Sequence, residues 1–179
     1  MCNKPELRAL CRRRLNALTE SCRREAGERI TARILASDAF REAKAVFCYV
    51  SVPPEPDTRR LIAEALKAGK TVCVPRCGAA GRMDAVRIRA LSELKEGRYG
   101  IPAPDGAAEP FPKEAIDLCL VPCLSAGKDG TRLGRGGGYY DRFLAGIQAR
   151  KICLCYRKML TEGLPAEETD VRMDAVITD

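Results

Sequence analysis

The residues whose types could do chemistry together are concentrated between positions 132 and 142, where the sequence reads RLGRGGGYYDR. Apolar residues at helical spacing begin where the glycines stop, so a glycine loop is expected to run into a helix. Glycines let backbone N–H groups turn toward one point, and the first turn of a helix adds further unpaired N–H groups. Arg132 and Arg135 would add guanidinium groups that match phosphate oxygens, and Asp141 would be placed to hold Mg²⁺. The stretch therefore predicts a phosphate-binding site.

A plainer interpretation is a surface turn whose glycines only permit tight packing, since glycine clusters are common. Two arginines and a carboxylate within the cluster favour the phosphate site. Neither of the better-known phosphate motifs is present. GxxxxGK[ST] is absent, and GxGxxG fails because Tyr139 stands where its last glycine should be.

Charge and composition narrow the chemistry that the chain can perform. The formal net charge of +7 favours anionic partners, namely nucleic acid, an acidic membrane or a polyanionic small molecule. Aromatic residues make up only 5% of the chain, which supplies few stacking platforms for single-stranded nucleic acid. The sequence contains no histidine, which excludes Ser-His-Asp and Cys-His catalysis and His-ligated zinc.

The ten cysteines do not predict a disulfide framework. The chain begins with a basic, polar helical pattern rather than an apolar signal segment, so we expect a cytoplasmic protein with reduced thiols. Most of the cysteines lie in short apolar runs, where a thiol packs as a small hydrophobe. No apolar run approaches the ~20 residues that a membrane span needs, so no membrane partner is expected. The length of 179 residues fits one domain, residues 1–179.

The N-terminal region predicts two helices, over residues 5–18 and 21–35. Lys4, Arg8 and Arg12 follow one another at intervals of four, which aligns three positive charges on one face of the first helix. Such a row is usually only solvated, and on its own it does not distinguish a solvated face from a binding face.

The central region predicts a strand–helix–strand unit. Residues 45–50 are a continuous apolar run of strand length, which is typical of a strand buried on both faces of a parallel sheet. A proline-rich loop follows, then a helix capped by Asp57 or Thr58 and ended by Gly69, then a second strand at 71–75. Ligands of such sheets bind beyond the carboxyl ends of the strands, where Val50 and Glu55 lie.

The remaining segments extend the same pattern. Alternating residues at 83–90 predict a more exposed strand, and the prolines and glycines of 97–112 predict a long loop. Further strands are expected at 117–124, 151–156 and 175–178. Together these elements indicate the α/β class with a mainly parallel sheet.

With these residues in view, the sequence resembles the 5-formyltetrahydrofolate cyclo-ligase family, whose members are also called 5,10-methenyltetrahydrofolate synthetases. The resemblance spans nearly the whole chain, and the RLGRGxGYYD pattern is close to diagnostic of it. The other matching positions are weaker and gain weight from their order: Lys4 with Arg8, Glu55, Val74-Pro75-Arg76, Gly100-Ile101-Pro102, Val121-Pro122, and Asp170 with Asp174.

The resemblance implies a three-layer α/β/α sandwich with a mainly parallel central sheet. It also implies an ATP- and Mg²⁺-dependent enzyme that converts 5-formyltetrahydrofolate to 5,10-methenyltetrahydrofolate and releases ADP and phosphate. In that reaction the formyl oxygen takes the γ-phosphate of ATP, and N10 of the folate then attacks the activated carbon. Phosphoryl transfer depends mainly on positioning and charge neutralisation, so the lack of histidine is no obstacle.

The resemblance also assigns roles to residues. Arg135, Tyr140 and Asp141 would be catalytic, and Asp141 with Asp170 would hold Mg²⁺. ATP would be bound by Lys4, Arg8, Arg132, Leu133, Gly134, Arg135, Gly136, Gly137, Gly138, Tyr139 and Tyr140. The folate substrate would be bound by Val50, Glu55, Arg135, Gly136, Gly137, Gly138 and Tyr139.

Two other functions stay open at this stage. A basic nucleic-acid-binding domain would use the same glycine loop for backbone phosphates, and a catalytically inactive relative would still bind folate. Under the resemblance the partners would be the small molecules ATP and 5-formyltetrahydrofolate, and we expect a monomer with no nucleic-acid partner.

Overall fold

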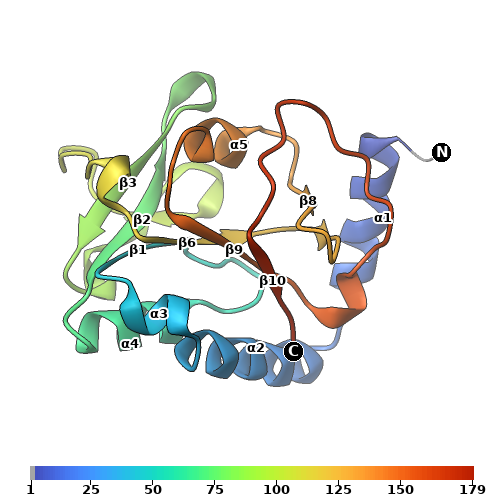
Figure 1. The fold of residues 1–179 in the computed structure, drawn as a ribbon, viewed down its shortest axis with the longest axis horizontal. Helices are drawn as coiled ribbons and strands as arrows, with labels where there is room; N and C mark the ends of the chain where they lie inside the picture. The colour runs from blue at the N-terminus through green and yellow to red at the C-terminus, as the bar shows by residue number, and fades with distance from the viewer. Residues whose placement is uncertain (1–2) are drawn as a thin grey trace.

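The computed structural model describes residues 3–179, and a six-stranded sheet with the order β10-β9-β6-β1-β2-β3 forms its centre (Figure 1). All neighbouring strands are parallel except β2 and β3, which are antiparallel. The strands are β1 (Ala45–Cys48), β2 (Thr71–Cys77), β3 (Met83–Ile88), β6 (Leu118–Pro122), β9 (Arg150–Leu154) and β10 (Ala175–Ile177). The predicted α/β fold with a mainly parallel sheet is therefore confirmed, and β3 makes the sheet mixed.

Helices cover both faces of the sheet, which explains why its central strands are apolar throughout. In Figure 1, α2, α3 and α4 lie along one face and α5 lies on the other. Phe47 of β1 is fully buried, and its ring packs against Phe143 of α5 with the ring centroids 4.6 Å apart. The helices are α1 (Lys4–Asn16), α2 (Glu20–Leu35), α3 (Asp38–Glu42), α4 (Arg59–Lys67) and α5 (Tyr139–Leu144).

The predicted strand–helix–strand unit is β1, α4 and β2. Leu61, Ile62 and Ala65 form the buried side of α4. Gly69 follows the helix with φ +73°, a left-handed conformation that glycine adopts without steric cost. The chain then re-enters the sheet beside β1, where Ala45 is in register with Thr71.

Two sequence-based expectations were wrong in detail, and one helix was missed. The strand at 83–90 is mostly buried rather than exposed, because α5 packs against it and the chain at Pro110 and Phe111 pairs with it, with Phe111 N–H donating to the carbonyl of Ala85 at 2.7 Å. The loop at 97–112 contains half of a hairpin, in which β4 (Lys95–Glu96) pairs with β5 (Pro102–Ala103). The short helix α3 was not predicted.

The remaining elements are short. A second hairpin joins β7 (Ser125–Ala126) to β8 (Arg132–Leu133) just before the glycine loop. Single 3₁₀ turns occur at η1 (Ala79–Gly81), η2 (Leu91–Glu93), η3 (Arg98–Gly100), η4 (Lys113–Ala115) and η5 (Arg157–Met159).

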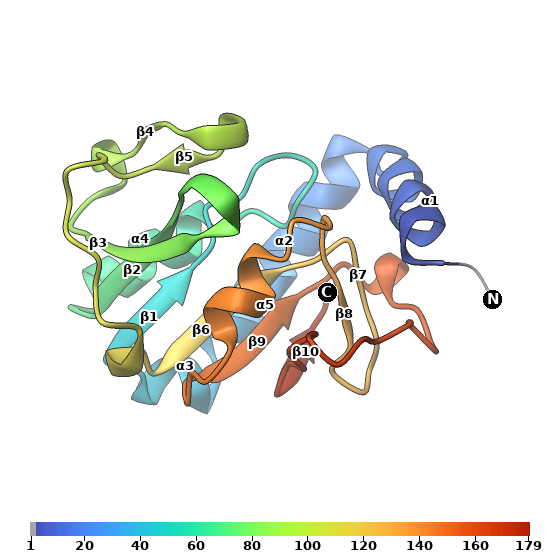
Figure 2. The ribbon, with the colours of Figure 1, turned by 90° about the horizontal axis from the view of Figure 1, so that it is seen from above.

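Strand order creates the place where a ligand is expected to bind. After β1 the chain moves toward β2, whereas after β6 it moves toward β9, so the two neighbouring strands β1 and β6 lead away in opposite directions. Their carboxyl ends leave a crevice of the kind that binds ligands in α/β proteins. Figure 2, seen from above, shows α1 beyond the β7–β8 hairpin, at the end of the molecule opposite β3.

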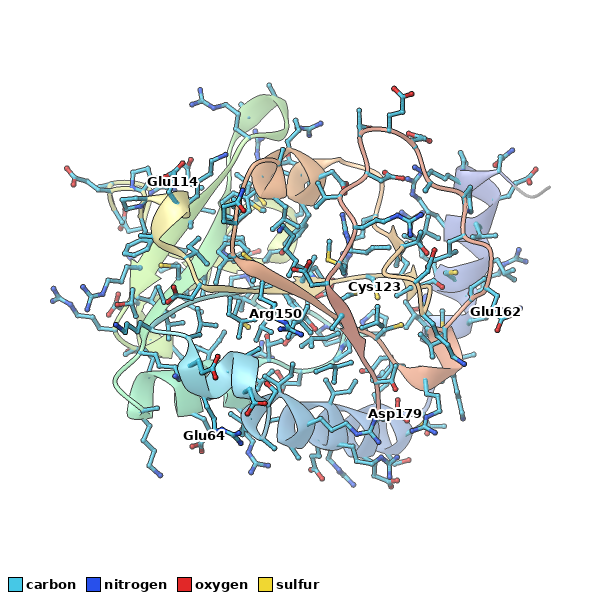
Figure 3. All side chains as sticks on the ribbon, viewed as in Figure 1. Glu64, Glu114, Cys123, Arg150, Glu162 and Asp179 are labelled. Carbon is cyan, nitrogen blue, oxygen red and sulfur yellow. The ribbon has the colours of Figure 1, made fainter. Side chains whose placement is uncertain are left out.

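Charged side chains surround this core. In Figure 3 the labelled Glu64 and Glu114 lie at the periphery, whereas Cys123 lies within the fold.

The cysteines at positions 11 to 155 are free thiols. Burial raises the pKa of the Cys73 and Cys119 thiols to about 12, so both stay protonated and pack as apolar groups. No helix within residues 3–179 is long and apolar enough to cross a membrane.

Candidate active site

A cavity of about 1010 Å³ opens beyond the carboxyl ends of β1 and β6. Tyr49 and Val50 follow β1 at its wall, and Pro122 and Cys123 line it from the end of β6. This is the crevice that the strand order predicts. Its volume reaches the upper end of the range for small-molecule sites, which suits an enzyme that binds two substrates together.

The glycine loop forms one wall of the cavity. Within the described part of the chain, no backbone N–H from Gly134 to Asp141 donates a hydrogen bond. Gly136 has φ +102° and Gly138 has φ +65°, and both values are unfavourable for residues with a Cβ atom. Unpaired backbone N–H groups in a glycine loop that lines a cavity can bind anions, so the loop is a candidate anion-binding surface.

The row of cations on α1 faces this loop. Arg8 Nε donates to the carbonyl of Gly134 at 3.0 Å, and Arg12 Nη2 donates to the carbonyl of Arg135 at 3.1 Å. Lys4 Nζ contacts Asp170 Oδ2 at 2.6 Å and Glu167 Oε1 at 3.0 Å. The basic face of α1 therefore packs against the glycine loop and the chain around Asp170, and α1 brings its charges across more than a hundred residues of sequence.

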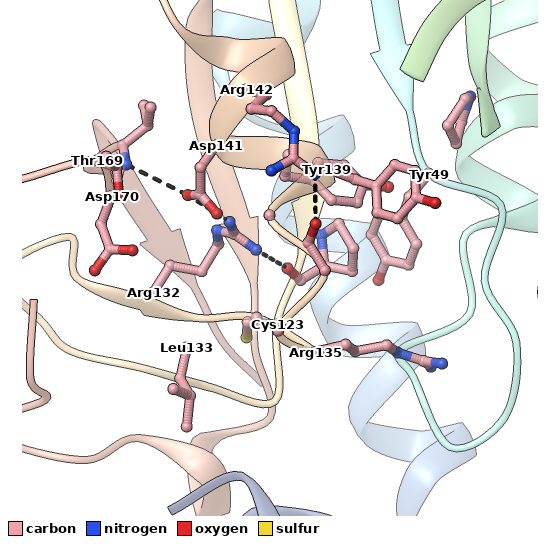
Figure 4. A pocket seen from close by; sticks show the side chains of 18 of the residues that line it. Tyr49, Cys123, Arg132, Leu133, Arg135, Tyr139, Asp141, Arg142, Thr169 and Asp170 are labelled. Carbon is pink, nitrogen blue, oxygen red and sulfur yellow. Dashed lines mark hydrogen bonds and ion pairs between the residues drawn. The ribbon is translucent and has the colours of Figure 1, made fainter. Parts of the chain in front are cut away.

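Two carboxylates beside the loop are paired with cations. Arg132 Nη2 contacts Asp141 Oδ1 at 2.8 Å (Figure 4). Lys4 Nζ contacts Asp170 Oδ2 at 2.6 Å. Burial works to raise the pKa of Asp170, but hydrogen bonds from Lys4 and from the backbone N–H of Glu167 lower it below its ordinary value of 3.8. Both carboxylates line the cavity beside the glycine loop.

The opposite end of the cavity is more apolar and contains one carboxylate, Glu55. Its side chain is 10% exposed, and Arg135 Nη2 lies 2.8 Å from its Oε1. The backbone N–H of Val52 donates to Oε2 at 3.1 Å, which fixes the carboxylate at the end of the proline-rich loop. Burial raises the pKa of Glu55 above its ordinary value of 4.5, and Arg135 offsets part of that shift.

Tyrosines separate and cover the two ends. The ring of Tyr140 lies under the guanidinium of Arg132, and burial raises the pKa of its hydroxyl well above the usual range. Tyr140 is therefore a hydrogen-bond donor at neutral pH rather than a base. Tyr99, in the turn between β4 and β5, has its hydroxyl 3.1 Å from that of Tyr139 and is 69% exposed. It extends the apolar wall toward solvent.

The structure brings every predicted site residue to this one cavity, although the role of each stays a prediction. Sequence reasoning missed several lining residues. Most of them come from loops and turns, where no periodic pattern marks them. The missed lining residues are Tyr49, Pro75, Cys77, Tyr99, Ile101, Pro122, Cys123, Arg142, Ala145, Glu167, Glu168, Thr169 and Val171.

Fold and cavity together are those of an α/β protein with a candidate ligand site at the switch point of its sheet. Comparison with known proteins makes the assignment specific. The model of the 5-formyltetrahydrofolate cyclo-ligase family matches residues 1–179, and the chain belongs to this family. The resemblance, the enzyme class and the cyclo-ligase activity predicted from the sequence are thereby confirmed at the level of the family, whose ligase chemistry implies ATP.

Individual relatives agree with the family assignment. The chain is 33% identical over 187 residues to the 5-formyltetrahydrofolate cyclo-ligase of Mycolicibacterium smegmatis, covering 98% of this chain and 93% of that protein. It is 31% identical over 175 residues to the Escherichia coli K12 protein of the same name, covering 94% and 96% respectively. The NMR structure of 5,10-methenyltetrahydrofolate synthetase from Aquifex aeolicus is similar with a TM-score of 0.87 and 29% identity, covering 97% of this chain and 88% of that one.

Proposed function

We propose that this cavity binds ATP, Mg²⁺ and 5-formyltetrahydrofolate together and that the chain forms 5,10-methenyltetrahydrofolate, ADP and phosphate there. The observation that carries the proposal is the run of unpaired backbone N–H groups from Gly134 to Asp141, which lines the same cavity as the cations Lys4 and Arg8 and the apolar side chains of Val50 and Ile101. The N–H groups and cations suit phosphates, and the apolar side chains suit the ring of a reduced pterin.

The triphosphate of ATP would lie along the glycine loop, between the loop and α1. Arg8 uses only Nε in contacts with the described residues, so its two terminal nitrogens are available to phosphate oxygens. Lys4 would bind a phosphate after its ammonium group leaves Asp170. Micromolar affinity requires about 8 kcal/mol, which neither one cation nor one helix terminus supplies, so the loop and α1 must act together.

The pterin would bind at the opposite end. Glu55 presents a carboxylate within apolar surroundings, and a carboxylate accepts two adjacent N–H donors of the kind that an aminopyrimidinone ring offers. Val50 and Tyr49 would pack against the ring, and Tyr99 is placed to cover it. Arg135 reaches from the glycine loop to Glu55, so it would contact the formyl group or the phosphate that is transferred to it.

Mg²⁺ fits the donor set at the phosphate end. Mg²⁺ commonly binds one or two carboxylates together with substrate phosphates, and both Asp141 and Asp170 line the cavity. In each, one oxygen accepts hydrogen bonds and the other has no partner among the described residues. When bound, the ion would neutralise charge on the phosphates during transfer. Each carboxylate would then hold the ion through its second oxygen.

A turnover assay tests the proposed function. Purified protein is mixed with 5-formyltetrahydrofolate, with and without ATP and Mg²⁺, and the methenyl product is followed by its absorbance while ADP and phosphate are measured. We expect product only when ATP and Mg²⁺ are both present, with one ADP formed per methenyl product. Binding of both ligands without turnover would refute the enzyme and leave a folate-binding relative. Steeply salt-dependent RNA binding without stabilisation by ATP would instead favour a nucleic-acid-binding protein.

We also expect residues 1–179 to act as one catalytic domain and as a monomer in the cytoplasm. The mass of the active protein in solution, measured by light scattering during size-exclusion chromatography, tests the oligomeric state.

A further inference from the structure

Arg132 differs from the other cations around the cavity because its side chain is nearly buried and its guanidinium is surrounded by other groups of the protein. Its side chain is 4% exposed. Nη2 contacts Asp141 Oδ1 at 2.8 Å, Nη1 donates to the carbonyl of Pro122 at 3.3 Å, and Cζ lies 5.6 Å from the centre of the Tyr140 ring. Little of the guanidinium is left to reach a ligand.

Stability is a poor explanation for an arginine in this position. Nε of Arg132 is buried and has no hydrogen-bond partner, which is the one such side-chain atom among residues 3–179. An unpaired buried N–H is unfavourable, and buried ion pairs often contribute less to stability than apolar residues of the same size. The presence of Arg132 is therefore better explained by its effect on the carboxylate of Asp141.

That partner, Asp141, is held from one side only. Oδ1 accepts hydrogen bonds from Arg132 Nη2 and from the backbone N–H of Val171 at 3.3 Å, whereas Oδ2 has no partner in the described part of the chain. Figure 4 shows the Arg132 side chain beside the Asp141 carboxylate. Two donors on one oxygen fix the orientation of the carboxylate and leave the other oxygen for a ligand. Groups behind metal ligands commonly act in this way.

Arg8 provides the contrast. Its Nε donates to the carbonyl of Gly134, its terminal nitrogens have no partner among the described residues, and it makes no contact with Asp141. Two arginines at the same cavity thus differ in what they can touch. Arg8 can reach phosphate, and Arg132 can reach the carboxylate.

We propose that Arg132 is a positioning residue, which orients Asp141 for the divalent cation and does not contact ATP. The proposal rests on the proposed function and changes the role that the resemblance gives to Arg132, which is direct ATP binding. It implies that Arg132 determines how much metal the enzyme needs. The nucleotide affinity of the metal-saturated enzyme then depends on Arg8 and the loop.

The test measures binding of a non-hydrolysable ATP analogue over a range of Mn²⁺ concentrations, with free Mn²⁺ followed by electron paramagnetic resonance. For Arg132→Met we expect the Mn²⁺ concentration at half-maximal binding to rise about 10–100-fold. At saturating Mn²⁺ the affinity for the analogue should return to the wild-type value. Arg8→Met is the matched control, because it removes the same charge from the same cavity. It should weaken analogue binding at every Mn²⁺ concentration without shifting the half-maximal concentration.

Two further variants protect the test against misfolding and against a purely structural effect. Arg132→Lys keeps the charge and offers Asp141 a single donor, so it should restore part of the Mn²⁺ affinity. Asp141→Asn should shift the Mn²⁺ dependence on its own, and adding Arg132→Met to it should produce no further shift, because the arginine acts through that carboxylate. Thermal unfolding without ligands identifies any variant that does not fold.

Each outcome is decisive. If Arg132→Met or Arg132→Lys lowers analogue affinity at saturating Mn²⁺, or leaves the Mn²⁺ dependence unchanged, the positioning role is wrong. Additive shifts in the double variant would overturn it too. If the wild-type protein binds no analogue at any Mn²⁺ concentration, the proposed function itself fails, which is a different result from failure of the inference about Arg132.

Discussion

Gly136→Ala tests whether the conformation of the glycine loop creates the anion site. Gly136 has φ +102°, and a Cβ atom there would lie 3.3 Å from Cζ and Nε of Arg8. For a residue with a side chain, a left-handed conformation costs about 1–2 kcal/mol. The crowding also displaces the Arg8 guanidinium, whose hydrogen bond to Gly134 at 3.0 Å is of the charged kind worth about 1.5–3 kcal/mol.

This energy should be lost from ligand binding rather than from folding. The loop amides have no internal partners that would hold the strained conformation, so the loop relaxes locally and its N–H groups no longer converge. Loss of one to two factors of ten in ATP affinity, about 1.4–2.7 kcal/mol, is expected. The free energy of unfolding without ligand should change by less than about 1 kcal/mol.

Gly146→Ala is the matched control. Gly146 has φ +76° with no atom within 4 Å of its added Cβ, and it does not line the cavity. Its variant should lose about 1–2 kcal/mol of stability and keep wild-type ATP affinity. Titration calorimetry gives the affinities, and urea unfolding gives the stabilities. Wild-type ATP affinity in Gly136→Ala, with lowered stability, would refute the reasoning, since the loop geometry would then be irrelevant to the nucleotide.

Three further predictions concern the charged pairs. Because the pKa of Glu55 is raised above 4.5 in the folded protein, its ionisation disfavours folding. The unfolding free energy of the wild type relative to Glu55→Gln should therefore fall as pH rises from that value through the folded pKa, and a flat difference in urea unfolding would contradict this. The pKa of Asp170 is lowered below 3.8, so the stability that it contributes is present above that pH and lost as pH falls through the folded pKa. Wild type and Asp170→Asn should consequently differ most near neutrality and converge in acid, and a gap that persists in strong acid would rule out the pairing with Lys4 as its source. Arg135→Ala should raise the ATP concentration needed for half-maximal turnover, and a change confined to the folate would show that Arg135 stays with Glu55.

The parts of the fold that sequence predicted are those with a strong local pattern. The apolar run at 45–50 and the helix after Thr58 are unambiguous, because burial on both faces and helical periodicity leave few alternatives. The connection after β2 is too short for a parallel crossover, so the antiparallel pairing of β3 follows from the sequence. The burial of β3 could not be predicted, since it depends on α5 and on the chain at Pro110 and Phe111. The β4–β5 hairpin also needs distant contacts.

Arg76 illustrates why the hairpin escaped prediction. Its Nη1 donates to the carbonyls of Asp105, Gly106 and Ala108, and its Nη2 contacts Asp84 at 3.2 Å. One arginine in β2 thus fixes the chain that leaves the hairpin. No periodic pattern reports such a contact, because the information lies at one position almost thirty residues away.

The candidate site was predictable in its phosphate half for the opposite reason. Glycines and cations are informative as residue types, and the glycine loop is contiguous, so its chemistry could be recognised before its partners were known. What sequence could not supply is how the charges pair. Lys4 with Asp170, Arg132 with Asp141, and Arg135 with Glu55 each join segments that are separate in the chain.

These pairs explain how a cavity lined by several cations can be stable before its anionic ligands arrive. In each of the three pairs the cation has a carboxylate partner at 2.6–2.8 Å, so no pair leaves an isolated charge. The pairs differ in how readily the cation can leave its carboxylate. Arg135 is 49% exposed and can move toward a ligand when that ligand donates to Glu55 in its place, because Glu55 is 10% exposed and would otherwise be left unpaired. Arg132, at 4% exposure, cannot exchange Asp141 without leaving a buried charge, and its fixed position is what the Mn²⁺ titration measures.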